Sequence, residues 1–159
     1  MVYIAVVGGS SCTKEEKTLA LETGFKIAER GAVLICGGGS GVMEAASEGA
    51  RQAGGTAIGI LPGNDHWEGN RHLSYAVATG LGEARNAIIT RTADAVIAIG
   101  GEYGTLSEIA LALKMGKPVI GLNSWSIKPQ HLLGSGIIVA STPEEAVNIA
   151  FQHSSKRKT

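Results

Sequence analysis

Glycine clusters follow several apolar segments of this chain, and their positions are the first feature that suggests chemistry. They are Gly8-Gly9 before Ser10, the run from Gly37 to Gly41, and the segment from Gly100 to Gly104. Glycine lets backbone N–H groups approach a bound anion, and a helix that begins directly afterwards adds unpaired N–H groups. Loops 37–41 and 100–104 both lead into helical patterns, so the sequence predicts a phosphate or oxyanion site there. A tight turn alone would explain the glycines of one such loop. Several glycine-rich loops at the same edge favour a ligand-binding site.

Three polar side chains stand close to these loops. Glu108 follows the second loop, where it could accept hydrogen bonds from sugar hydroxyls or act in acid–base chemistry. The spacing Thr105-x-x-Glu108 is equally that of a helix capping box. Arg85 lies early in a predicted helix, where a cation opposes the helix dipole, so either an anionic ligand or a surface ion pair with Glu83 or Glu102 would explain it. Its neighbour Asn86 could bind a ligand or be solvated.

The common nucleotide and hydrolase motifs do not occur. Val42 stands where GxGxxG needs its last glycine, and Cys36 rather than an acidic residue ends the second apolar segment, so NAD is not expected. No GK[ST] sequence and no GxSxG elbow is found around Ser40. The four histidines lack metal-ligand spacing, and no metal is expected. Trp67 and Tyr103 could stack on a planar ring or simply pack.

The elements that must position these residues alternate between apolar strand patterns and helices. Strands are predicted at 2–7, 32–36, 56–60, 75–79, 94–99, 118–122 and 136–139, and helices at 13–30, 42–53, 83–92, 105–115 and from Thr142 onward. Strands that are apolar throughout belong in a sheet covered on both faces. We therefore expect a three-layer, Rossmann-like open sheet, mainly parallel, with helices on both faces. Ligands of such sheets bind at the carboxyl ends of the strands, where the glycine clusters lie.

Length and composition limit the possible classes of protein. The 159 residues carry 14 basic and 14 acidic side chains and fit one domain. We expect that domain at 1–153 and a solvated, disordered basic tail at 154–159. Because Lys156, Arg157 and Lys158 lie in the tail, the rest is slightly acidic, which argues against nucleic-acid partners. The apolar runs are strand-sized and the two cysteines are far apart, so we expect no membrane partner and a cytoplasmic location.

The loop residues resemble a known family. Gly37-Gly38-Gly39-Ser40-Gly41-Val42-Met43 is similar to the GGGxxGxM loop of the Lonely Guy family, and Arg85-Asn86, Ala93-Asp94-Ala95 and the stretch from Gly100 to Glu108 resemble its RK…ADA…PGGxGTxxE block. The family includes cytokinin-nucleotide phosphoribohydrolases, many once mislabelled lysine decarboxylases, and nothing here suggests a pyridoxal phosphate (PLP) lysine. This short chain most resembles a compact branch that includes molybdenum cofactor carrier proteins.

The resemblance implies a homodimer or homotetramer with its site at the glycine-rich loops. It implies Arg85 and Glu108 as the catalytic pair if the protein is an enzyme. Gly100, Glu102 and Asn86 stand where Pro, Gly and Lys are usual. These departures weaken the case for hydrolysis, because Glu102 adds a negative charge and Asn86 removes a positive one. The expected ligand-binding set is Gly8, Gly9, Ser10, Gly38, Gly39, Gly41, Val42, Met43, Arg85, Asn86, Gly100, Gly101, Gly104, Thr105 and Glu108.

Three functions fit these observations. The first is a carrier that holds a small phosphorylated ligand, the pterin-type molybdenum cofactor, as cargo. The second is a nucleoside 5′-monophosphate phosphoribohydrolase, an N-glycosidase that releases the base and ribose 5-phosphate. The third is a nucleotide-sensing module. Chain length and the departures in the loops favour the carrier.

Overall fold

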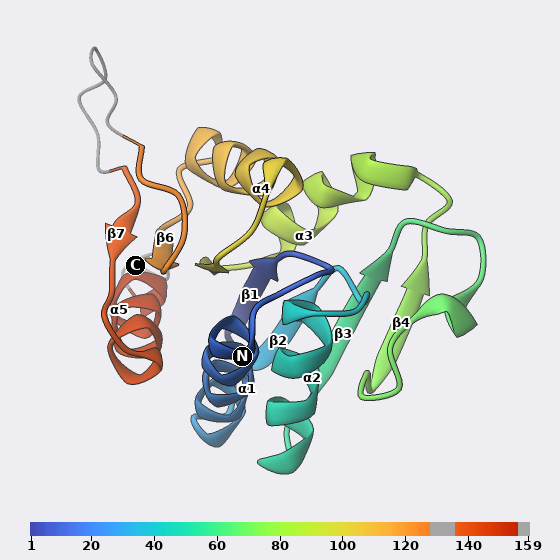
Figure 1. Cartoon of the computed structure of the whole chain (residues 1–159), viewed down its shortest axis with the longest axis horizontal. Coiled ribbons are helices and arrows are strands. Elements are labelled where there is room, and N and C mark those ends of the chain that lie inside the picture. Colours follow the sequence, from blue (N-terminus) through green and yellow to red (C-terminus); the bar gives the residue numbers. More distant parts are fainter. Residues whose placement is uncertain (128–135, 156–159) are drawn as a thin grey trace.

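The protein was analysed as a computed structural model that describes residues 1–127 and 136–155 (Figure 1). Within these residues a seven-stranded sheet has the order β4-β3-β2-β1-β5-β6-β7, and every pair of neighbours is parallel. The strands are β1 (Tyr3–Gly8), β2 (Val33–Cys36), β3 (Ala57–Leu61), β4 (Tyr75–Ala78), β5 (Ala95–Ile99), β6 (Val119–Leu122) and β7 (Ile138–Val139). The predicted Rossmann-like α/β fold is confirmed.

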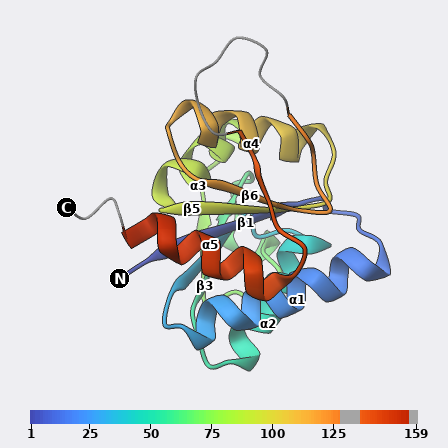
Figure 2. The same ribbon diagram turned by 90° about the vertical axis from the view of Figure 1, so that its left-hand side faces the viewer.

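In the part of the chain that the structure describes, five α-helices cover the two faces of the sheet, and Figure 2 shows the strands between two helical layers. One layer contains α1 (Lys14–Glu29), α2 (Val42–Gln52) and α5 (Pro143–Ser155), and the other contains α3 (Asn86–Thr92) and α4 (Tyr103–Lys114). Two short 3-10 helices, η1 (His66–Glu68) and η2 (Gly82–Arg85), lie in the connections.

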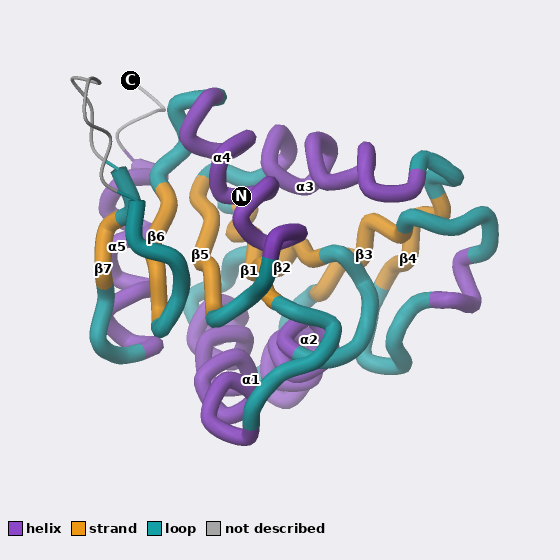
Figure 3. Tube along the Cα trace, turned by 45° about the horizontal axis from the view of Figure 1, so that its top comes forward, coloured by secondary structure: helices purple, strands orange, loops and turns teal. Residues whose placement is uncertain are grey.

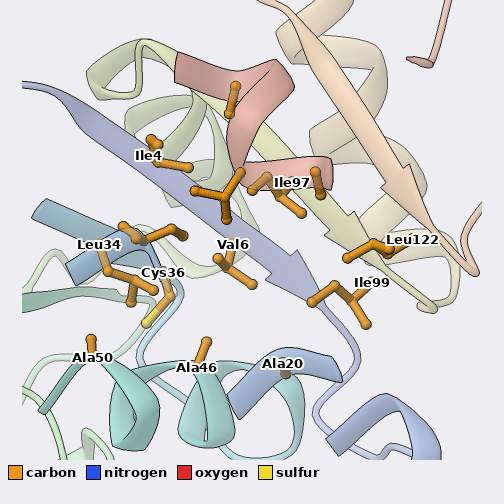
Figure 4. Close-up of a cluster of buried hydrophobic side chains, with 14 of the residues drawn as sticks. Ile4, Val6, Ala20, Leu34, Cys36, Ala46, Ala50, Ile97, Ile99 and Leu122 are labelled. Atoms are coloured by element: carbon orange, nitrogen blue, oxygen red, sulfur yellow. The ribbon is translucent and has the colours of Figure 1, made fainter. Parts of the chain in front are cut away.

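Alternate residues of each central strand supply the two cores. Ile4 and Val6 of β1 face Ala20 of α1 and Ala46 of α2, and the small alanines let these helices lie close to the sheet (Figure 4). Ala5 and Val7 point the other way and pack with Ile89 of α3 and Ile109 of α4. Burial on both faces explains why these strands are apolar throughout rather than alternating.

Several predicted boundaries are corrected. The helix expected at 105–115 begins two residues earlier, at Tyr103, and the helix expected at 83–92 is a 3-10 turn followed by α3. The last helix continues through Ser155, past the predicted domain limit at residue 153, while residues 156–159 of the expected tail lie outside the described residues. Because helix ends depend on tertiary packing as well as on propensity, they are the least certain part of a sequence-based assignment.

The strand order reverses direction at β1, because β2 and β3 lie on one side of it and β5 and β6 on the other, as Figure 3 shows. In open parallel sheets the crevice for a ligand forms at such a switch point, outside the carboxyl ends of the strands. Loops 8–13 and 100–102 leave β1 and β5 at this point. No helix of the described residues is both long and apolar enough to cross a membrane.

Candidate binding site at the carboxyl edge of the sheet

A cavity of about 310 Å³ lies at the switch point, where several predicted loops converge. Its walls come from the end of β1, the start of α2, the η2–α3 segment and the start of α4. The lining residues are Gly8, Gly9, Ser10, Ser11, Met43, Pro62, Glu83, Arg85, Asn86, Glu102, Gly104, Thr105 and Glu108. The structure thus brings the loops after β1 and β5 to one site, together with Met43 from the first turn of α2.

Direct hydrogen bonds join the loops that follow β1 and β2. The hydroxyl of Ser40 donates to the carbonyl of Ser10 at 2.8 Å, and the backbone N–H of Val42 donates to the carbonyl of Gly9 at 3.0 Å. A Cβ atom at Gly8 would lie 2.5 Å from Cγ1 of Val42, so a larger residue at position 8 would separate β1 from α2. The absence of a side chain at Gly8 is therefore needed for the packing of β1 against α2 as well as for the approach of a ligand.

Arg85 and Glu108 form the charged pair of the cavity. Nη1 of Arg85 lies 3.7 Å from Oε1 of Glu108, and both side chains are largely buried. Burial raises the pKa of Glu108 to about 7, although the nearby positive charge of Arg85 acts in the opposite direction. Nε of Arg85 is buried without a hydrogen-bond partner among the described residues. The alternative of a surface ion pair between Arg85 and Glu83 or Glu102 is therefore wrong.

Asn86 fixes the position of this guanidinium. Its Oδ1 accepts a hydrogen bond from Nη1 of Arg85, and its Nδ2 donates to Oγ of Ser107 at 3.4 Å. Ser107 in turn donates to the carbonyl of Gly104 at 2.7 Å. The alternative of a solvated Asn86 is also wrong, because the residue is buried and links α3 to the first turns of α4.

The start of α4 offers backbone donors to the cavity. Glu102 is the N-cap residue and makes no side-chain capping bond. Within the described residues, no backbone or side-chain acceptor takes the N–H groups of Tyr103, Gly104 and Thr105. The capping box proposed for Thr105 and Glu108 does not exist, because Thr105 is the third residue of the helix and Glu108 lies a turn further on. Glu108 is thus available to a ligand.

Nine of the predicted ligand-binding residues line the cavity and six do not. Gly38 packs against Leu61, with its N–H donating to Sγ of Cys36 at 3.4 Å, and Val42 is fully buried. Gly100 and Gly101 line separate cavities next to the main one. The predicted residues outside the cavity are Gly38, Gly39, Gly41, Val42, Gly100 and Gly101.

Four lining residues are absent from the predicted ligand-binding set, namely Ser11, Pro62, Glu83 and Glu102. Ser11 follows the predicted Gly8-Gly9-Ser10 directly, so a longer reading of that loop would have included it. Pro62 comes from the end of β3, whose approach depends on tertiary structure. Trp67 is 82% exposed and lies outside the cavity. No cluster of metal-ligating side chains occurs in the part of the chain that the structure describes.

Solved structures of similar proteins match almost the whole chain. The molybdenum cofactor binding protein of the phototrophic bacterium Rippkaea orientalis is 40% identical, with a TM-score of 0.86 over 95% of this chain and 96% of that protein. The Moco carrier protein of Chlamydomonas reinhardtii is 34% identical, with a TM-score of 0.86 over 98% of each chain.

Curated relatives include cytokinin riboside 5′-monophosphate phosphoribohydrolases. The one from Mycobacterium tuberculosis is 31% identical over 77% of this chain and 71% of its own length. A probable one from Oryza sativa is 34% identical, but the alignment spans 67% of this chain and only 45% of the rice protein. The model of the SLOG cluster4 family matches residues 1–147. By this match and its near full-length likeness to carrier proteins, the chain belongs to the SLOG cluster4 family, in the compact, molybdenum-cofactor-carrier-like branch of the Lonely Guy superfamily.

Proposed function

We propose that this protein binds the molybdenum cofactor as cargo and holds it at the carboxyl edge of the sheet. The observation that carries this proposal is the match, over at least 95% of the chain, to two proteins described as binding or carrying that cofactor. The cavity at the switch point supports it, because its position is the expected one for a phosphorylated ligand in an open parallel sheet.

The chemistry of the cavity suits a phosphate group. The first N–H groups of α4 carry partial positive charge and point out of the helix start, and the guanidinium of Arg85 can form two parallel hydrogen bonds to an anion. Nε of Arg85, which is buried and unpartnered within the described residues, is a donor that a ligand phosphate would satisfy. Glu108, with a pKa near 7, is partly protonated at neutral pH and repels the anion less than an ordinary glutamate would.

The second candidate is hydrolysis of a nucleoside 5′-monophosphate. It is favoured by one observation, the Arg85–Glu108 pair at 3.7 Å, because these two residues match the catalytic pair of the resembling hydrolases. A carboxylate beside the ribose would stabilise positive charge as the N-glycosidic bond breaks. Glu102 at the helix start is the feature that opposes it, because the resembling hydrolases usually have glycine at this position.

Mass spectrometry of the ligand that copurifies with the protein tests the carrier, and an AMP hydrolysis assay tests the enzyme. A carrier retains a pterin-type compound and releases no adenine. Glu108→Gln then binds this ligand as well as the wild type or better, because a negative charge is removed. Release of adenine at an enzymatic rate that falls with Glu108→Gln, but not with Glu29→Gln outside the cavity, would establish the hydrolase instead.

A further inference from the structure

A row of three further cavities continues from the main cavity along the carboxyl edge toward β6 and β7. Their volumes are about 340, 320 and 510 Å³. Glu102 lines both the main cavity and the first of the row, Gly101 lines the first and second, and Trp125 lines the second and third. The shared residues make this row one trough, which begins at the phosphate-binding cavity and passes over the loop that ends β5.

The charges of the trough differ from those of the main cavity. Both regions carry carboxylates, those of Glu83, Glu102 and Glu108 in the main cavity and those of Glu15, Glu16 and Glu102 in the trough. They differ in that Arg85 lines the main cavity, whereas no basic side chain lines the trough among the described residues. An anionic group is therefore attracted to the Arg85 end only, and the trough favours neutral groups that donate hydrogen bonds.

The three carboxylates of the trough differ in whether they already accept hydrogen bonds from the protein. Oε2 of Glu16 accepts from the N–H of Thr13 at 3.0 Å, and Oε1 of Glu15 accepts from Nδ2 of Asn123 at 3.2 Å. The Glu102 carboxylate is exposed and makes no hydrogen bond or ion pair with any described residue. Its oxygens are thus acceptors at the junction of main cavity and trough.

Two aromatic rings lie next to the backbone of Glu102. Nε1 of Trp125 donates to the carbonyl of Glu102 at 3.2 Å, which holds the indole against the loop, and the rings of Trp125 and Tyr103 are 6.1 Å apart. Beside the indole the trough is walled by Gly100 and Gly101, which have no side chains to obstruct a flat group. A flat aromatic surface, bare backbone and carboxylate acceptors together suit a planar ring that bears N–H groups.

We propose that the trough is a subsite for a planar heterocycle with a 2-amino-4-oxopyrimidine edge, the edge shared by pterins and guanine. The ring stacks on Trp125, and its adjacent N–H groups donate to Glu102. This inference rests on the proposed function for the anchoring of the ligand's phosphate beside Arg85. It also assigns the orientation of the bound ligand, with the phosphate beside Arg85 and the ring beside Trp125.

Binding measurements with defined probes test the subsite. In a Trp67→Phe background Trp125 is the only tryptophan, so quenching of its fluorescence reports a ring stacked on it. GMP, which has both the phosphate and the required edge, is expected to quench and to bind about tenfold tighter than AMP or ribose 5-phosphate. Calorimetric titration with neutral 6-hydroxymethylpterin measures whether the subsite binds the ring when no phosphate is attached.

Variants separate the parts of the site. Trp125→Leu is expected to lower GMP affinity about five- to tenfold while leaving ribose 5-phosphate unchanged, and Trp125→Phe retains most of the affinity because it keeps a ring. Glu102→Gln reduces the preference for GMP over AMP. Glu29→Gln, which changes an exposed carboxylate at the end of α1 outside the main cavity and the trough, leaves that preference unchanged.

The outcomes distinguish this inference from the proposed function. Pterin binding that depends on Trp125 identifies a pterin ligand, and dependence seen with GMP alone identifies a guanine nucleotide; both support the subsite. Equal affinity for GMP and AMP, no quenching and no Trp125 dependence with either probe would overturn it. Ribose 5-phosphate binding that is unaffected by Arg85→Ala would instead count against the phosphate site, whatever the subsite does.

Discussion

Asn86 holds the guanidinium of its sequence neighbour Arg85 and at the same time reaches across to Ser107 on α4. The resembling hydrolases usually have lysine at this position, which would add a positive charge. Here asparagine supplies orientation instead of charge, because its amide can accept from Arg85 with one end and donate to Ser107 with the other. The pair thus joins α3, α4 and the cavity in one hydrogen-bonded chain.

Removing this link should weaken anion binding without removing a charge. Asn86→Ala frees the Arg85 side chain to adopt other rotamers, so we expect ribose 5-phosphate affinity to fall several-fold and stability to fall by about 1 kcal/mol. Ser107→Ala is the matched control, since it removes the second contact of Asn86 but leaves the contact to Arg85. Calorimetric titration checks the effect, and equal losses in both variants would contradict a specific role for the Arg85 contact.

The raised pKa of Glu108 predicts a particular dependence of stability on pH. The carboxyl titrates near pH 7 in the folded protein, compared with 4.5 in its ordinary state, so between these values the folded protein holds a proton that the unfolded chain releases. Stability therefore falls as pH rises through this range. Glu108→Gln should be more stable than the wild type at pH 8.5, by about 1–3 kcal/mol, and no more stable at pH 4. Urea unfolding at both pH values measures this, with Glu83→Gln as the control.

Gly101 and Gly104 should respond oppositely to substitution by alanine. Gly101 has φ +97°, and a Cβ atom there would lie 2.3 Å from Oγ1 of Thr105, so Gly101→Ala should lose at least about 1 kcal/mol of stability. Gly104 lies in α4 without positive φ, and a Cβ atom there meets nothing within 4 Å. Gly104→Ala should leave stability unchanged or raise it by up to about 1 kcal/mol. Thermal unfolding of the two variants distinguishes them.

Binding to Gly104→Val tests the anion site. Gly104 has no positive φ, so backbone strain does not enter. Because Gly104 lines the main cavity, the valine methyl groups should crowd the ligand and lower ribose 5-phosphate affinity while the protein remains folded. Undiminished affinity by calorimetry would place the anion elsewhere.

Exposed apolar residues at β4 and α3 support the expected homo-oligomer. Tyr75 and Val77 of β4 and Ile88 of α3 are 66%, 47% and 37% exposed. On α4, Ile109 and Ala112 are buried within the chain, whereas Ala110 is exposed and Leu111 is half-buried. We expect light scattering at micromolar concentration to give a dimer or tetramer, and Val77→Glu with Ile88→Glu to dissociate it. A wild-type monomer under these conditions would refute the expectation.

Much of the fold could be predicted from the sequence because its signals are local. The continuous apolar runs of β1 and β5 and the glycines after them are enough to indicate a parallel sheet with a ligand edge, and the Thr13–Glu16 capping box marks the start of α1 in the sequence and in the structure. Periodicity and turn chemistry depend on neighbouring residues, so they can be read without knowing how distant segments pack.

Only the tertiary structure decided which side chains meet. The spacing of Thr105 and Glu108 fits a capping box, yet α4 begins at Tyr103 because the β5 loop ends there, and this leaves Glu108 to face Arg85. Nothing local brings Trp125 beside Glu102, since β6 must first pair with β5. The sequence by itself thus determined the elements and the edge of the sheet where the cavity lies, whereas the pairing of charges and the shape of the trough depend on contacts between segments far apart along the chain.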